Sequence, residues 1–67
     1  MKVNLLRGKM VANGYTVETA AKCLGMSRNT LSSKINGKSE FNADEVIRLC
    51  ELLHIDDPAQ KVEIFLS

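Results

Sequence analysis

The sequence predicts an all-α fold, a compact bundle of four to five short helices that forms one domain of residues 1–67. Two observations support this prediction. Apolar residues recur at the three- and four-residue spacing of a helix face along most of the chain. Residues that favour helix starts, and glycines that favour helix ends, divide the chain into short segments. A chain of this length has room for one core, which buries only about 60% of the surface of the unfolded chain.

The first expected helix covers about residues 3–13 and ends at Gly14. Its inward residues have helical spacing: Val3, Leu6 and Met10. We expect this helix to support the core. Tyr15 follows it and is expected to anchor the core or its rim, because a lone aromatic ring is a poor platform for stacking bases.

Residues 16–37 have the pattern of a helix-turn-helix. Thr16 can cap the first helix, whose inner face is small enough for a second helix to cross close by. This face consists of Ala20, Ala21 and Leu24. Gly25 can end the helix in the left-handed conformation, and Met26 is expected to fill the gap between the two helices.

The second helix of this pattern is expected over residues 28–36. Ser27 is a good cap for its start, and Gly37 is a good stop after its end. At about 100° per residue, Leu31 and Ile35 fall on one face of this helix. That apolar face is expected to contact the core.

The opposite face of the second helix is polar and carries no acidic group. It consists of Asn29, Ser33 and Asn36, with Arg28 in the first turn. Amide, hydroxyl and guanidinium groups are those that read base edges in the major groove, which is wide enough to admit a helix. The alternative is a solvated surface helix. It is disfavoured because solvated faces usually mix Glu with Lys, whereas no acidic residue lies between Glu18 and Glu40.

A third strong start signal lies at Asn42, after the loop of residues 38–40. Asn42 and Glu45 can form a capping box, and Phe41 can pack on Val46 as a hydrophobic staple. The helix is expected to run from Ala43 to about Leu53. Its predicted buried stripe is Val46, Ile47, Cys50 and Leu53, widened by Leu49 and Leu52.

The last expected helix begins at Asp57-Pro58, where aspartate caps and proline takes the first helical position, and runs to about Glu63. The tail of residues 58–67 ends in three apolar residues, Ile64, Phe65 and Leu66. Three apolar side chains at the end of a chain are expected to pack against other apolar residues. Either they contact a second subunit in a homodimer, or they fold back on Leu49 and Leu53 of their own chain.

The net charge of +1 is distributed unevenly along the chain. Residues 1–38 carry seven basic residues and one acidic residue, a net of +6, whereas residues 39–67 carry two basic and seven acidic residues, a net of −5. A basic half that contains the predicted helix-turn-helix is typical of a phosphate-binding face. The residues expected to contact phosphates are Lys22, Ser27, Lys34, Asn36 and Lys38, with Arg7 and Lys9 as further candidates.

Other functional classes lack a matching pattern. Cys23 and Cys50, with only His54 near them in the sequence, make no zinc or redox motif, and we expect two reduced, mostly buried thiols. His54 is expected to face the negative end of a helix dipole. We expect no catalytic residue, metal or cofactor, because no nucleophile–base pair or phosphate loop is evident. No stretch has the length of a membrane span or the apolar core of a signal peptide, which favours a cytoplasmic protein.

The order of helix, helix-turn-helix, capped helix and short helix resembles the family of Cro and lambda-repressor-like DNA-binding proteins. The resemblance covers about residues 5–55 and depends most on Ala21, Gly25, Ser27, Leu31 and Asn36-Gly37. It implies that the second helix of the motif lies in the major groove. The residues that would contact bases there are Arg28, Asn29, Thr30 and Ser33. The chain departs from the family at Val17, where many members have a phosphate-binding glutamine, and at Lys34-Ile35, where the last apolar position is shifted by one.

The function expected from these residues and this resemblance is sequence-specific binding to double-stranded DNA. The protein would be a repressor or Cro-like regulator of a phage or prophage in a bacterial host. A homodimer on an inverted-repeat operator is expected, with no small-molecule ligand. The alternative is an antitoxin-type or adaptor helical module that binds another protein. An acidic or apolar outer face on residues 28–36 would favour that alternative, whereas a polar and basic face favours DNA.

Overall fold

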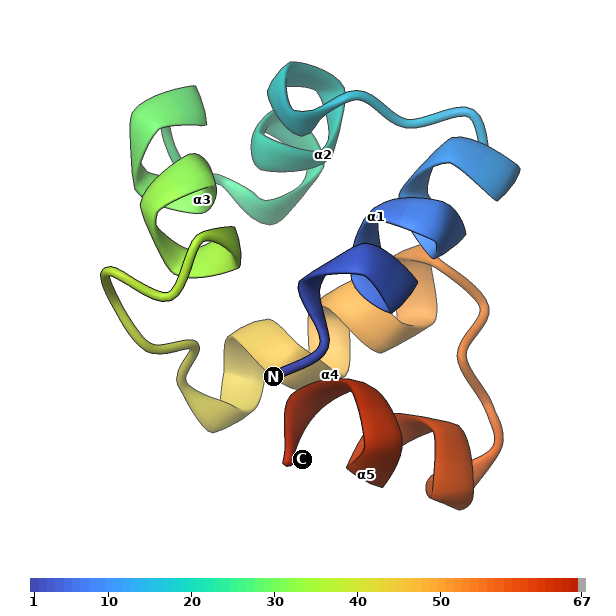
Figure 1. Cartoon of the computed structure of the whole chain (residues 1–67). Helices are drawn as coiled ribbons and strands as arrows, with labels where there is room; N and C mark the ends of the chain where they lie inside the picture. The colour runs from blue at the N-terminus through green and yellow to red at the C-terminus, as the bar shows by residue number, and fades with distance from the viewer. Residues whose placement is uncertain (67) are drawn as a thin grey trace.

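The computed structural model describes residues 1–66 and contains five helices and no strand over this range (Figure 1). The predicted all-α fold is therefore confirmed. The helices are α1 (Val3–Ala12), α2 (Val17–Leu24), α3 (Arg28–Ile35), α4 (Ala43–Leu52) and α5 (Pro58–Phe65). The predicted tail is described except for Ser67, which lies outside these residues.

Helices α2 and α3 lie together on one side of the molecule, and α5 lies on the other (Figure 1). The pairs of helices in closest contact are α2 with α3, α2 with α4, and α1 with α5. Helices α1 and α4 lie between these two sides of the molecule (Figure 1). This arrangement leaves the side of α3 that faces away from the core open to solvent.

Side-chain caps fix where four of the helices begin. The N–H of Thr19 donates to the hydroxyl of Thr16, and the N–H of Glu45 donates to the side chain of Asn42. Ser27 and Asp57 cap α3 and α5 in the same way. These four caps were predicted and are confirmed, because a capping side chain bonds a backbone group only two or three residues away.

Every helix contributes to one buried core. Its members are Leu6, Met10, Ala20, Ala21, Leu24, Leu31, Ile35, Leu49, Cys50, Leu53, Ile55 and Ile64. The predicted stripe of α4 was wrong at one residue. Ile47 is 56% exposed, whereas Leu49 is fully buried. Residues three, four and seven positions from Val46 share its face of a helix, and Ile47 lies about 100° away from Val46.

The C-terminal end of the chain folds onto its own core. Helix α5 extends to Phe65, two residues past the expected end, and Ile64 is 2% exposed. The ring of Phe65 meets the edge of Phe41 at a centroid distance of 6.0 Å. The N–H of Lys2 donates to the carbonyl of Ile64 at 2.8 Å. The assignment of Ile64 to a dimer contact was therefore wrong, because its side chain is buried in its own chain. Leu66, by contrast, is 78% exposed and remains available for such a contact.

No helix within residues 1–66 has both the length and the apolar character needed to cross a lipid bilayer.

Candidate nucleic-acid interface

The start of α3 is positioned by a three-residue turn after α2. Gly25 has a φ of 73°, in the left-handed region, and ends α2. The N–H of Met26 then donates to the carbonyl of Ala21 at 3.0 Å, and Met26 packs against the core as predicted. Ser27 accepts a hydrogen bond from the N–H of Thr30 at 3.1 Å. The turn therefore fixes both the position and the direction of the first turn of α3.

The first turn of α3 presents its side chains to solvent. Arg28, Asn29 and Thr30 are all exposed. The side chains of Arg28 and Asn29 form no hydrogen bond or ion pair within residues 1–66. The hydroxyl of Thr30, by contrast, accepts a hydrogen bond from Ser27 at 2.8 Å. Two of the four predicted base-contacting residues thus have donors and acceptors available for a ligand.

Ser33, the fourth residue predicted to contact bases, lies one turn further along α3 and is half-buried. The backbone folds back around it. The N–H groups of Lys38 and Ser39 both donate to the carbonyl of Ser33, at 2.9 and 3.3 Å. These bonds cap the end of α3 and set the start of the loop that follows.

The last turn of α3 is held by other parts of the chain. The ammonium of Lys34 bonds a carboxylate oxygen of Glu45 at 2.5 Å, and the two side chains are only 14% and 19% exposed. This pairing disfavours the predicted phosphate contact of Lys34, because its charge is already neutralised in a partly buried site. The guanidinium of Arg7 donates to the side-chain oxygen of Asn36 at 3.1 Å. Asn36 in turn lies 3.4 Å from the hydroxyl of Ser32.

Glu45 of α4 forms an ion pair with Lys34 of α3. Its carboxylate accepts hydrogen bonds from Lys34 and from the N–H of Asn42. These two bonds hold the pKa of Glu45 below its ordinary value, and the bond from Lys34 has the larger effect. One carboxylate thus completes the capping box of α4 and anchors α3. The sequence indicated only the capping role.

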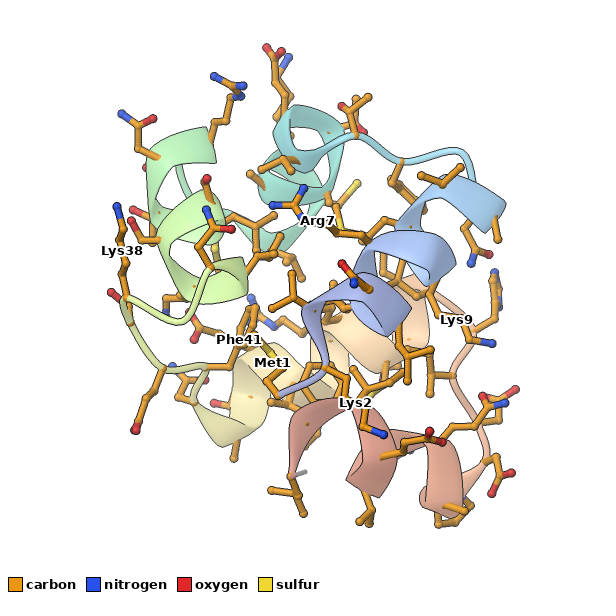
Figure 2. The ribbon with its side chains drawn as sticks, in the orientation of Figure 1. Met1, Lys2, Arg7, Lys9, Lys38 and Phe41 are labelled. Carbon is orange, nitrogen blue, oxygen red and sulfur yellow. The ribbon has the colours of Figure 1, made fainter. Side chains whose placement is uncertain are left out.

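Exposed basic side chains lie on α2 and in the loop after α3, the two elements next to α3. Lys22 on α2 and Lys38 in the loop after α3 are exposed and form no ion pair within the described chain. Figure 2 shows Lys38 beside α3, with Arg7 reaching from α1 toward α3. Lys9 points away from α3 on the far side of α1, which excludes it from this surface (Figure 2). The basic surface near α3 therefore comprises Arg7, Lys22, Arg28 and Lys38.

The cysteines and the histidine do not form a joint site. Both thiols are free, and the prediction that both are buried was wrong, because Cys23 is exposed. Cys50 lies in the core, where burial raises the pKa of its thiol. His54 has a φ of 55° in the turn after α4. Within residues 1–66, no three His, Cys, Asp or Glu side chains come together as metal ligands would.

Comparison with known protein families gives a match over residues 2–66 to a family described as Protein of unknown function (DUF739). The chain belongs to the DUF739 family. This family match covers all five helices of the DUF739 protein and the whole surface around α3. No curated protein and no solved structure matches the chain. These comparisons name no function, so a proposal of function depends on the chemistry of the surface around α3.

Proposed function

We propose that this DUF739 protein binds double-stranded DNA at specific sequences through α3. The observation that carries the proposal is the first turn of α3, where Arg28 and Asn29 are exposed and have no partner side chain in the described chain. A guanidinium pairs with the O6 and N7 atoms of guanine, and a carboxamide pairs with the N6 and N7 atoms of adenine. These two residues would supply most of the sequence discrimination.

The basic residues around α3 would bind the phosphate backbone. Phosphate contacts fix the register of a protein on the duplex without reading its sequence. Lys22, in the last turn of α2, and Lys38, in the loop after α3, are exposed and have unpaired charges among the described residues. Arg7 would serve both DNA and Asn36, because one guanidinium has several N–H donors. The acidic second half of the chain would disfavour any approach of DNA from that side.

Such a protein would act as a Cro-like regulator of a phage or prophage in the cytoplasm of a bacterial host. It would repress transcription by occupying an operator and excluding polymerase. One α3 contacts only a few base pairs, whereas two copies on a two-fold axis read two half-sites one helical turn apart. We therefore propose that the operator is an inverted repeat bound by two copies of the chain.

Selection of bound duplexes from a random DNA pool tests this proposal. The wild-type protein is expected to enrich an inverted repeat, and an Arg28→Ala, Asn29→Ala double variant is expected to enrich none. Circular dichroism establishes that both proteins are equally helical. If the wild-type protein enriches no sequence, DNA recognition is excluded and the antitoxin-type or adaptor module becomes the better assignment.

A further inference from the structure

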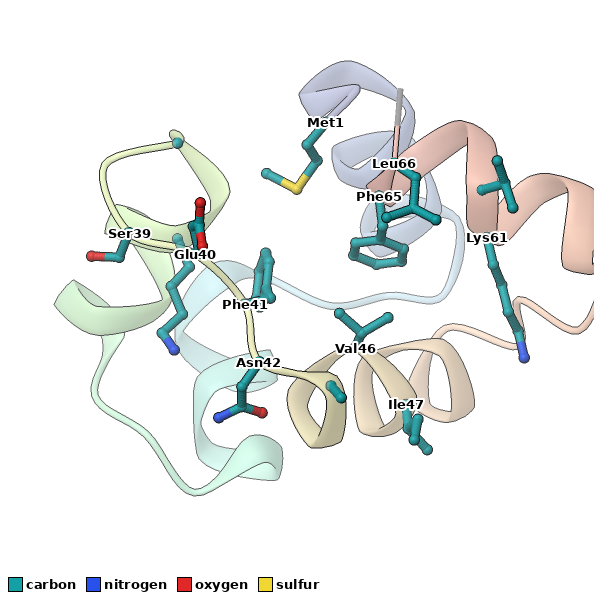
Figure 3. Close-up of a pocket in the computed structure, with 14 residues that line it drawn as sticks. Met1, Ser39, Glu40, Phe41, Asn42, Val46, Ile47, Lys61, Phe65 and Leu66 are labelled. Carbon is teal, nitrogen blue, oxygen red and sulfur yellow. The ribbon is translucent and has the colours of Figure 1, made fainter.

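An apolar groove of about 680 Å³ lies on the side of the molecule formed by α4, α5 and the loop of residues 38–42 (Figure 3). Phe41, Val46 and Phe65 lie in the centre of this groove, where Phe41 and Phe65 are in contact. All three are only partly buried by their own chain. The groove therefore has a rigid aromatic floor that solvent can still reach.

The rim of the groove contains most of the exposed apolar surface of the molecule. Ile47 is 56% exposed, Val62 is 54% exposed and Leu66 is 78% exposed, and all three line the groove. The remaining large exposed apolar side chains, Leu5 and Val11, belong to α1 and do not line it. Three exposed apolar side chains around one groove are more typical of an interaction surface than of scattered surface residues.

The two charged ends of the groove indicate which partner fits. Glu40 lies at one end and Lys61 lies at the other (Figure 3). Neither side chain forms an ion pair within residues 1–66. A two-fold interface is reciprocal. If Glu40 of one copy contacts Lys61 of the other, then Lys61 of the first copy also contacts Glu40 of the second. A two-fold axis that crosses the apolar centre at right angles to the line from Glu40 to Lys61 would therefore place Glu40 of each copy against Lys61 of the other.

We propose that a second copy of this chain docks in this groove and forms a two-fold dimer. The apolar contact would involve Ile47, Val62 and Leu66, and the two Glu40–Lys61 pairs would fix the orientation of the copies. This interface differs from one made by the tail alone, because α4 and the loop after α3 also line the groove. It leaves Arg28 and Asn29 free, since neither lines the groove.

The dimer deepens the proposed DNA-binding function but is tested without DNA. Half-sites about 34 Å apart require each α3 to lie about 17 Å from the two-fold axis. The principal extents of the molecule are 28 × 24 × 21 Å, so a molecule of this size can hold a helix about 17 Å from an axis at its surface. A standard interface buries about 800 Å² per partner. That is about a fifth of the 4301 Å² surface of this chain.

Sedimentation equilibrium over a wide concentration range tests the dimer with charge-reversal variants. Glu40→Lys alone and Lys61→Glu alone each place like charges together at both ends of the interface, and each is expected to weaken dimerisation about tenfold or more. The double variant restores opposite charges in the swapped order. It is expected to dimerise with nearly wild-type affinity, which separates a direct pair from a general effect of charge.

A second pair of variants tests the apolar contact. Val62→Glu is expected to make the protein monomeric, whereas Val11→Glu, at a similarly exposed position of α1, is expected to leave the dimer unchanged. Thermal melts establish that each variant is folded. The proposal is overturned if the wild-type protein is monomeric throughout, if the double charge variant is no better than the single variants, or if Val62→Glu dimerises normally. A monomer that still selects specific DNA would overturn the dimer alone, and a dimer that selects none would overturn the DNA-binding function alone.

Discussion

The two ends of α3 differ in what their side chains contact. At the first turn, Arg28 and Asn29 extend into solvent and have no partner side chain within residues 1–66. At the last turn, Lys34 is paired with Glu45 of α4, and Asn36 accepts a hydrogen bond from Arg7 of α1. A helix of eight residues thus has one free end and one end anchored to two other helices.

This difference indicates a division of roles along one short helix. A group that recognises a ligand must leave its hydrogen-bonding atoms open, whereas a group that positions the helix must use them within the protein. The anchored end holds α3 at a fixed angle to α1 and α4. The free end can then present two side chains from a helix of fixed orientation, so that little rotational freedom of the helix is lost on binding.

The largest expected effect is at the free end. Arg28→Ala and Asn29→Ala are each expected to lose about 1–3 kcal/mol of discrimination between the selected duplex and random DNA, with a smaller loss for Ser33→Ala, which is half-buried. Competition binding measures this loss. Arg48→Ala is the matched control, because it removes an exposed arginine from α4. Binding of all three variants at the wild-type level would show that the free end does not read bases.

The anchored end is broken by Glu45→Gln, which leaves the ammonium of Lys34 partly buried without a counter-charge. We expect a lower melting temperature and weaker binding to specific and random duplexes alike, because α3 loses its fixed position. Asp44→Asn, one residue earlier in the same helix turn, is the control for loss of a negative charge. A specific loss of sequence discrimination, with an unchanged melting temperature, would contradict the anchoring role.

The same ion pair predicts how stability depends on pH. The pKa of Glu45 is lowered in the folded protein from its ordinary value of 4.5, so its contribution is fully present above that pH. It is lost as the pH falls through the lowered value, because the folded state must then accept a proton on a paired carboxylate. The difference in unfolding free energy between the wild type and Glu45→Gln should therefore shrink as the solution is acidified. A constant difference would contradict this assignment.

The sequence predicted the free end of α3 better than the anchored end. Caps are local, so Thr16, Ser27, Asn42 and Asp57 could be identified from two- and three-residue patterns. The exposed polar face of α3 followed from helical periodicity. The Lys34–Glu45 pair spans 11 residues and the Arg7–Asn36 bond spans 29 residues, so both depend on how the helices pack. No local pattern predicts such contacts.

Two burial errors have a different origin. Cys23 was predicted to be buried because of residue type, since cysteine is among the residues most often found inside proteins. Ile47 was predicted to belong to the buried stripe of its helix. Their helical positions give the correct answer. Cys23 lies about 100° from Leu24, on the side of α2 away from the core. Position on the helix was therefore more informative than hydrophobicity at these two residues.

Substitution of Gly25, in the turn before the free end of α3, is expected to have a smaller effect, on stability. Gly25→Ala is expected to destabilise the protein by about 1–2 kcal/mol, because a residue with a Cβ is strained at this left-handed φ. Gly8→Ala, at an exposed position inside α1 with no atom near the added Cβ, is expected to stabilise it by about 0.5–1 kcal/mol. Urea denaturation measures both. Equal effects of the two substitutions would exclude a conformational role for Gly25.

The smallest expected effect is on the proposed phosphate contacts beside the free end. Lys38→Ala should lower affinity for specific and random duplexes equally, because a phosphate contact carries no sequence information. A salt titration should show the slope of log K against log salt concentration reduced by about 0.9 for one lost contact. Lys9→Ala is the matched control, since Lys9 points away from α3 (Figure 2). An unchanged slope for Lys38→Ala would remove Lys38 from the interface, and a reduced slope for Lys9→Ala would extend the interface beyond the surface around α3.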